Sequence, residues 1–86
     1  MPDRPAKHSL TLHGHRTSVS LEDEFWEALR EVAQAEGRPV AALAAEIDAA
    51  RPPQMGLASA IRLHLLRHFR NKARTSARGS GGPSAV

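Results

Sequence analysis

The sequence contains no cysteine in its 86 residues. No disulfide can therefore support the fold, and no thiolate can bind a metal ion. A hydrophobic core of this size rarely contributes more than about 3–5 kcal/mol, so small domains usually need further support. Association with another chain is the common support that remains.

Long apolar runs are also missing. No run in the sequence approaches the roughly 20 apolar residues that span a bilayer. The first residues, Met1 to Pro5, lack the apolar stretch of a signal peptide. We therefore expect a cytoplasmic protein with no membrane partner.

Catalytic patterns are absent as well. We find no activated nucleophile, no glycine-rich phosphate loop and no paired catalytic carboxylates. The acidic residues at 22–24 suit the start of a helix, where the helix dipole favours negative charge. We therefore expect a protein that is not an enzyme and needs no cofactor.

Charge is distributed unevenly along the chain. Up to Arg16 there are three basic residues and one acid, and from Thr17 to Leu66 there are four basic and eight acidic residues. From Arg67 onward there are five basic residues and no acid. Basic ends suit a polyanion such as DNA, although terminal Lys and Arg can also serve solubility alone.

Composition divides the chain into a disordered leader at 1–7, one folded domain at 8–71 and a flexible basic tail at 72–86. Within the domain, the stretches 8–13 and 16–21 alternate with a period of two and predict β-strands. Gly14 between them permits a bend.

Three helices are predicted after the strands. The first begins near Leu21, with Ser20 as N-cap and Asp23 in a variant of the capping box, and it ends at Gly37. The second has Pro39 in its first turn and stops before Pro52 and Pro53. The third runs from about Leu57 or Ala58 to Asn71, after a loop at 52–56.

The strands need a partner, because unpaired backbone donors and acceptors are costly. The stretch 10–12 could fold back on 19–21 as a hairpin, with at most two residues in the turn around Gly14. The other possibility is a strand from a second chain, which a two-fold dimer brings in antiparallel.

This order of elements resembles the ribbon-helix-helix family of bacterial transcription factors, the Arc and MetJ type. The resemblance is carried by residues 16–21, by the acidic helix start at 22–24, by residues 25–29 and by the turn at 37–40. Residues 8–69 are similar to a longer branch of the family, marked by the stretches 12–22, 45–48 and 57–62. The resemblance implies a mainly α-helical homodimer with an intermolecular antiparallel two-stranded ribbon and a third helix in each chain.

The same resemblance implies a DNA-binding transcriptional regulator, of the repressor type, that places its ribbon in the major groove of double-stranded DNA. Arg16, Ser18 and Ser20 would then point outward to base edges. Backbone amides around Arg38, Val40 and Ala41 would meet phosphate at the start of the second helix. The dimer core would contain Thr17, Val19, Leu21, Phe25, Trp26 and Leu29.

Histidine offers a different chemistry. His13 and His15 alternate on a predicted strand, and His64 and His68 lie four apart on a predicted helix, so each pair shares one side of its element. Either spacing could hold zinc or nickel. No carboxylate is obviously tied to either pair, so we expect no metal site.

A second class of function stays open. A ribbon-helix-helix dimer could act as a protein-interaction module, like an antitoxin or an adaptor, with little or no specific DNA binding. The acidic middle of the chain favours this alternative, in which the basic tail or the third helix would bind a protein partner. DNA binding requires Arg16, whereas the interaction module does not.

Overall fold

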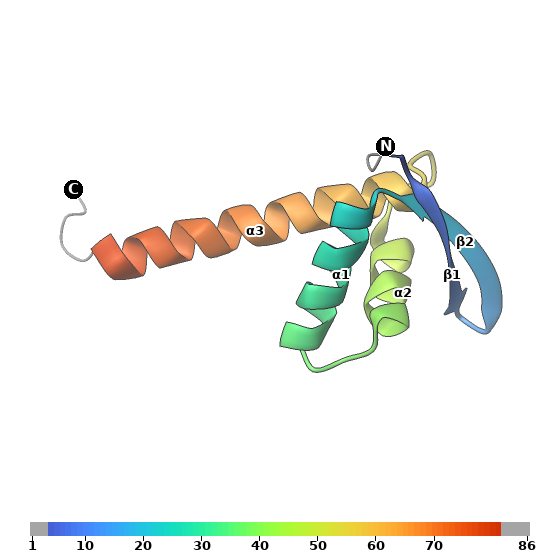
Figure 1. Ribbon diagram of the computed structural model, residues 1–86, viewed down its shortest axis with the longest axis horizontal. Helices are drawn as coiled ribbons and strands as arrows, with labels where there is room; N and C mark the ends of the chain where they lie inside the picture. Colours follow the sequence, from blue (N-terminus) through green and yellow to red (C-terminus); the bar gives the residue numbers. More distant parts are fainter. Residues whose placement is uncertain (1–3, 82–86) are drawn as a thin grey trace.

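The computed structural model describes residues 4–81, with side chains described as far as Arg74. Its elements are β1 (Ala6–Leu12), β2 (His15–Leu21), α1 (Asp23–Ala35), α2 (Val40–Ala50) and α3 (Leu57–Gly81). Figure 1 shows the two strands packed against one end of the helical part, with α1 and α2 beneath α3 and the far half of α3 extending beyond them. The predicted order of a strand region and three helices is confirmed.

The strands form an antiparallel hairpin within one chain, with Leu12 opposite His15. Only His13 and Gly14 form the turn, and both have positive φ, 53° and 80°. Such a two-residue turn matches the twist of the strands it joins. The ribbon therefore exists as predicted, but its strands belong to the same chain, in place of the intermolecular pairing that the family resemblance implies. The first strand also begins at Ala6, inside the predicted disordered leader.

One face of the hairpin packs on the helices. Leu10 and Leu12 of β1 and Val19 and Leu21 of β2 are buried, as the period of two predicts. Each helix contributes an apolar stripe to the same core. These stripes contain Leu29, Val32 and Ala33 of α1, Leu43, Ala44 and Ile47 of α2, and Ala60, Ile61 and Leu65 of α3.

The start of α1 differs from the prediction. Glu22 is the N-cap and makes no side-chain cap hydrogen bond, whereas Ser20 lies within β2, opposite Lys7. The predicted N-cap at Ser20 is therefore wrong, because the strand continues to Leu21 before the helix begins. The backbone of Ser20 is extended and pairs with β1, and the residue lies two positions before the N-cap, so its side chain does not cap the helix.

The end of α1 agrees with the prediction. Gly37 has φ +68°, its amide donates to the Gln34 carbonyl, and the Arg38 amide donates to the Ala33 carbonyl. These two hydrogen bonds form a Schellman motif, in which glycine tolerates the left-handed backbone. The chain then turns directly into α2.

The boundaries of the last two helices agree in part. Helix α2 ends at Ala50, before Pro52, and α3 begins at Leu57, as predicted. Helix α3 continues to Gly81, so its predicted end at Asn71 is wrong. No proline interrupts the chain there, and Arg, Lys and Ala are good helix formers. The outer parts of the predicted leader and tail, 1–3 and 82–86, lie outside the described residues. None of the described helices combines the length and apolar character that crossing a membrane requires.

Candidate functional site

The outward face of the hairpin carries polar and basic side chains. Arg16, Ser18 and Ser20 of β2 are all exposed on it, as predicted. Strand β1 places three further exposed side chains beside them, with Lys7 opposite Ser20, Ser9 opposite Ser18, and Thr11 opposite Arg16. The site predicted from sequence therefore contained only one of the two strands of this face. Alternation of Ser9 and Thr11 with the leucines was the signal that could have revealed the other.

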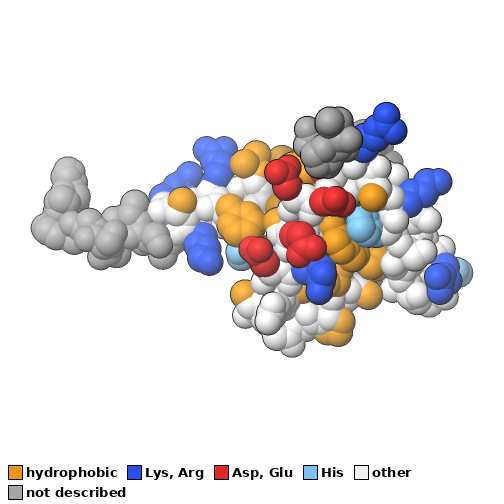
Figure 2. All heavy atoms as spheres, viewed as in Figure 1, with side chains coloured by type: hydrophobic (Ala, Val, Ile, Leu, Met, Phe, Trp, Pro, Cys, Tyr) orange, Lys and Arg blue, Asp and Glu red, His pale blue; other side chains and the backbone are white. Residues whose placement is uncertain are grey.

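The outward face of the hairpin is basic, whereas acidic side chains gather on the helices. The outward face holds Lys7 and Arg16 and no acid, and neither cation forms an ion pair among the residues that the structure describes. Figure 2 shows Lys and Arg side chains over the hairpin end and along α3, with Asp and Glu gathered over the start of α1. The acids near 22–24 therefore lie off the outward face. This face can attract a polyanion.

The start of α2 is a second polar surface. Pro39 is its N-cap and its carbonyl accepts from the amides of Ala42 and Leu43. Within the described part of the chain, the amides of Val40 and Ala41 donate no backbone hydrogen bond. An open hollow lies at this position. Free amides at the start of a helix can bind an anion. The geometry therefore permits the predicted phosphate contact at Val40 and Ala41, which stays a prediction.

Arg38 differs from its neighbours in this surface. Its Nε lies 2.9 Å from Oε1 of Glu36, and a terminal nitrogen lies 2.6 Å from Oε1 of Glu46. The hydrogen bond to Glu46 is the main cause that raises the pKa of Arg38 above its usual value. The guanidinium is therefore already engaged, and two carboxylates lie close to the predicted phosphate position.

The six predicted dimer-core residues divide into two groups. Val19, Leu21 and Leu29 are buried inside a single chain, where they hold the hairpin against α1. The remaining three, Thr17, Phe25 and Trp26, are half-buried. Their participation in a dimer stays a prediction.

The half-buried aromatic residues have partners that sequence did not predict. Trp26 stacks on the His8 ring, with centroids 4.1 Å apart and planes 6° from parallel. The Arg62 guanidinium lies 5.5 Å from the centre of the Phe25 ring. Both contacts join parts of the chain that are distant in sequence, so no local pattern indicates them.

The histidines are arranged differently from the prediction. His13 belongs to the turn and His15 follows it in β2, so they are not alternate residues of one strand. The Nε2 atom of His13 lies 3.9 Å from Oδ2 of Asp48. His64 and His68 both lie on α3, as predicted, and His68 meets the Phe69 ring edge-on. Among the residues that the structure describes, no group of three or more metal-binding side chains is close enough to hold an ion.

Comparison with known proteins identifies the fold family. A family model described as a ribbon-helix-helix domain matches residues 5–69, which include both strands, α1, α2 and the first half of α3. No curated protein and no solved structure matches the chain. The hairpin followed by helices agrees with the matched family. The chain belongs to the ribbon-helix-helix family.

Proposed function

We propose that this chain is a dimeric DNA-binding transcriptional regulator of the repressor type, which presents the outward face of its hairpin to the major groove. The observation that carries the proposal is this face, on which two basic and four hydroxyl side chains are exposed without any acid. Membership of the ribbon-helix-helix family supports it.

The dimensions of the hairpin suit the groove. Adjacent strands lie about 4.8 Å apart, and the major groove, about 12 Å wide, admits a two-stranded ribbon. Arg16 can donate two hydrogen bonds to one guanine, and Ser18 and Ser20 can contact several bases. Arg16 is therefore the residue we expect to contribute most to sequence discrimination.

Strand β2 also has an edge that could pair with a second copy. Within the described residues β2 pairs only with β1, so its other edge has free backbone donors and acceptors. Antiparallel pairing of β2 with the same strand of a second copy is an isologous contact and extends the hairpins to four strands. Such a sheet is about 14 Å between its outer strands, wider than the groove. The two β2 strands would enter the groove, and Lys7 on β1 would lie near phosphate.

The alternative, an antitoxin-like or adaptor-like interaction module, has one observation in its favour. Leu66 and Phe69 on α3 are exposed large hydrophobic side chains, and apolar surface of this kind often binds another protein. This function predicts that Arg16 is dispensable and that α3 is essential.

Fluorescence anisotropy tests the proposal. The duplex comes from upstream of the protein's own gene and is compared with a scrambled duplex over a salt series. Arg16→Ala should lose roughly 5- to 150-fold in affinity for the first duplex and its preference over the scrambled one. Lys7→Ala should weaken both duplexes alike and lower the salt slope by about one.

Arg51→Ala is the matched control, since Arg51 follows the end of α2 opposite to Val40 and Ala41, lies off the hairpin face and contacts Asp48 and Met55 of its own chain. It should leave both affinities unchanged. If the chain binds both duplexes equally and the binding disappears as salt is added, the contact is electrostatic and does not depend on DNA sequence. Absence of binding at low salt would contradict the proposal and favour the interaction module.

A further inference from the structure

The outer part of α3 extends beyond the core that the rest of the chain forms. Leu65 is 2% exposed, whereas Leu66 is 52% and Phe69 is 38% exposed. The α3 arm, residues 66–81, extends about 24 Å past Leu65, and Figure 1 shows it beyond α1 and α2. A helical segment of this length is marginal in water without a packing surface.

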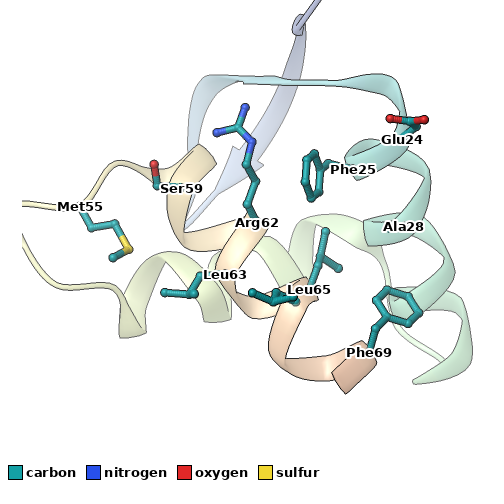
Figure 3. Close-up of a pocket in the computed structure, with 10 residues that line it drawn as sticks. Glu24, Phe25, Ala28, Met55, Ser59, Arg62, Leu63, Leu65 and Phe69 are labelled. Carbon is teal, nitrogen blue, oxygen red and sulfur yellow. The ribbon is translucent and has the colours of Figure 1, made fainter. Parts of the chain in front are cut away.

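An open apolar groove of about 670 Å³ lies at the base of this arm. Phe25 and Ala28 of α1 line one side, and Met55 lies at its far end (Figure 3). Helix α3 contributes several side chains, among them Leu66 and Phe69. Leu66 and Phe69 are three residues apart and therefore share a face of the helix. Leu66 and Phe69 therefore extend the apolar lining of the groove onto the base of the arm.

Opposite charges lie on the two elements that border this surface. Helix α3 contains no acidic residue, and its arm exposes Arg67, Arg70, Lys72 and Arg74. Helix α1 exposes Asp23, Glu24, Glu27 and Glu31, and Glu24 also lines the groove. Within the described residues, no ion pair involves the four basic residues of the arm. The arm leads away from the acids of its own chain (Figures 1 and 2).

We propose that a second copy of this chain occupies the groove, with the α3 arm of each protomer lying across the groove of the other. Leu66 and Phe69 then become buried between the two copies, and the basic residues of each arm face the acids of the partner's α1. A two-fold axis satisfies both contacts at once. Charge complementarity between arm and α1 selects the second copy over DNA as the occupant.

The position of the hairpin supports this assignment. Figure 1 shows the hairpin and the arm at opposite ends of the molecule. DNA bound to the hairpin is therefore out of reach of the same chain's arm. Pairing of two β2 strands uses the backbone edge of residues 15–21, whereas residues 24–69 of the helices and the loop before α3 line the groove, so the two contacts use different residues. A chain that uses both contacts, about two perpendicular two-fold axes, assembles as a tetramer of two dimers paired through β2. The inference goes beyond the proposed function, because the arm contact requires neither pairing of the β2 strands nor DNA binding.

Sedimentation equilibrium of the full chain tests the proposal with charge-reversed variants. Glu24→Lys with Glu27→Lys reverses the groove, and Arg70→Glu with Arg74→Glu reverses the arm. Each double variant alone should have half the assembly mass of the wild type at low salt. An equimolar mixture should recover the wild-type mass, because each mixed contact again joins opposite charges. Circular dichroism of each variant checks that the fold is retained.

The apolar part of the contact has its own variant. Leu66→Ser with Phe69→Ser changes exposed side chains, so the fold should persist while self-association weakens at least tenfold. Ala49→Ser on the exposed side of α2 is the control and should keep the wild-type mass.

The mass should halve whether or not the β2 strands of two copies also pair. If they pair, a tetramer becomes a dimer, and if they do not, a dimer becomes a monomer. A wild-type chain that is monomeric at tens of micromolar overturns the proposal and leaves the groove to another protein's amphipathic helix. Unchanged mass in all three variants, or a mixture that recovers nothing, also overturns it. DNA binding that fails while the mixture recovers its mass rejects the proposed function alone.

Discussion

Arg62 of α3 donates two hydrogen bonds to a single oxygen of Glu22, the residue that precedes α1. Its Nε and one terminal nitrogen lie 3.0 Å and 2.7 Å from Oε1 of that carboxylate. The same guanidinium lies over the Phe25 ring. This one side chain therefore fastens α3 to the junction between the hairpin and the first helix.

Stability should depend on pH through this contact. The hydrogen bond from Arg62 is the main cause that lowers the pKa of Glu22 below its ordinary value of 4.5. A carboxylate with a lowered pKa stabilises the fold above that ordinary value, and this contribution is lost as the pH falls through the folded-state pKa. Glu22→Gln should therefore lower the melting temperature at pH 7, and its difference from the wild type should shrink below about pH 4.5.

Thermal unfolding followed by circular dichroism from pH 7 to pH 3 measures this difference. Glu36→Gln is the control, because Glu36 is an exposed carboxylate 2.9 Å from the Nε of Arg38, and such surface pairs contribute little. A Glu22→Gln difference that stays constant across the range would contradict the role of the ionised carboxylate.

Local sequence signals account for most of the architecture. Alternation at Leu10, Leu12, Val19 and Leu21 indicates the buried face of the hairpin, and Gly37 indicates the end of α1. Both signals depend on neighbouring residues alone, which is why sequence can reveal them. The exposed positions of Arg16, Ser18 and Ser20 follow from the same alternation.

Other features depend on contacts between distant residues. The hydrogen bonds of Arg62 join residues 40 positions apart, and the stack of His8 on Trp26 depends on how the hairpin meets α1. The sequence left open whether the strands pair within a chain or between chains. Asparagine or aspartate before glycine is the strong signal of a two-residue hairpin turn, and His13 stands at that position here. Ser20 is a residue type that often caps a helix, but it pairs with β1 in the hairpin, and the helix begins after Glu22.

Adjacent residues of β2 should respond oppositely to the same substitution. Val19 is 3% exposed in the core, and Ser18 lies on the outward face. Val19→Asp should unfold the chain, since a buried carboxylate costs more than the roughly 3–5 kcal/mol that a core of this size contributes. Ser18→Asp should keep the wild-type helical signal in circular dichroism. A folded Val19→Asp variant in sedimentation and circular dichroism would contradict the assignment of the two faces.

The turn of the hairpin should be sensitive to backbone conformation alone. A side chain at Gly14 would meet no atom within 4 Å, but its φ is +80°. Gly14→Ala should therefore destabilise the chain by about 1–2 kcal/mol through the left-handed backbone. Gly56→Ala is the matched control, because Gly56 also has free space and its φ lies outside the left-handed range. Urea unfolding measures both, and equal losses at the two glycines would contradict the account.

DNA affinity should rise when the ion pair between Arg38 and Glu46 is removed. Glu46→Gln removes the charge 2.6 Å from that guanidinium, and it also removes a negative charge near the start of α2. We expect roughly two- to fivefold tighter binding at low salt, and less at high salt, because the effect is electrostatic. Glu31→Gln, on the exposed side of α1, serves as the control. Anisotropy titration would contradict the phosphate contact if Glu46→Gln bound more weakly than the control.

The most direct test of the central claim is to map the DNA-bound surface by NMR. Backbone amide shifts of the isotopically labelled chain are recorded while the duplex from upstream of its gene is added at moderate salt. The account predicts the largest changes at the outward hairpin residues, above all Arg16, Ser18 and Ser20, with a second group at Val40 and Ala41. Changes confined to the α3 arm, with an unperturbed hairpin, would contradict it.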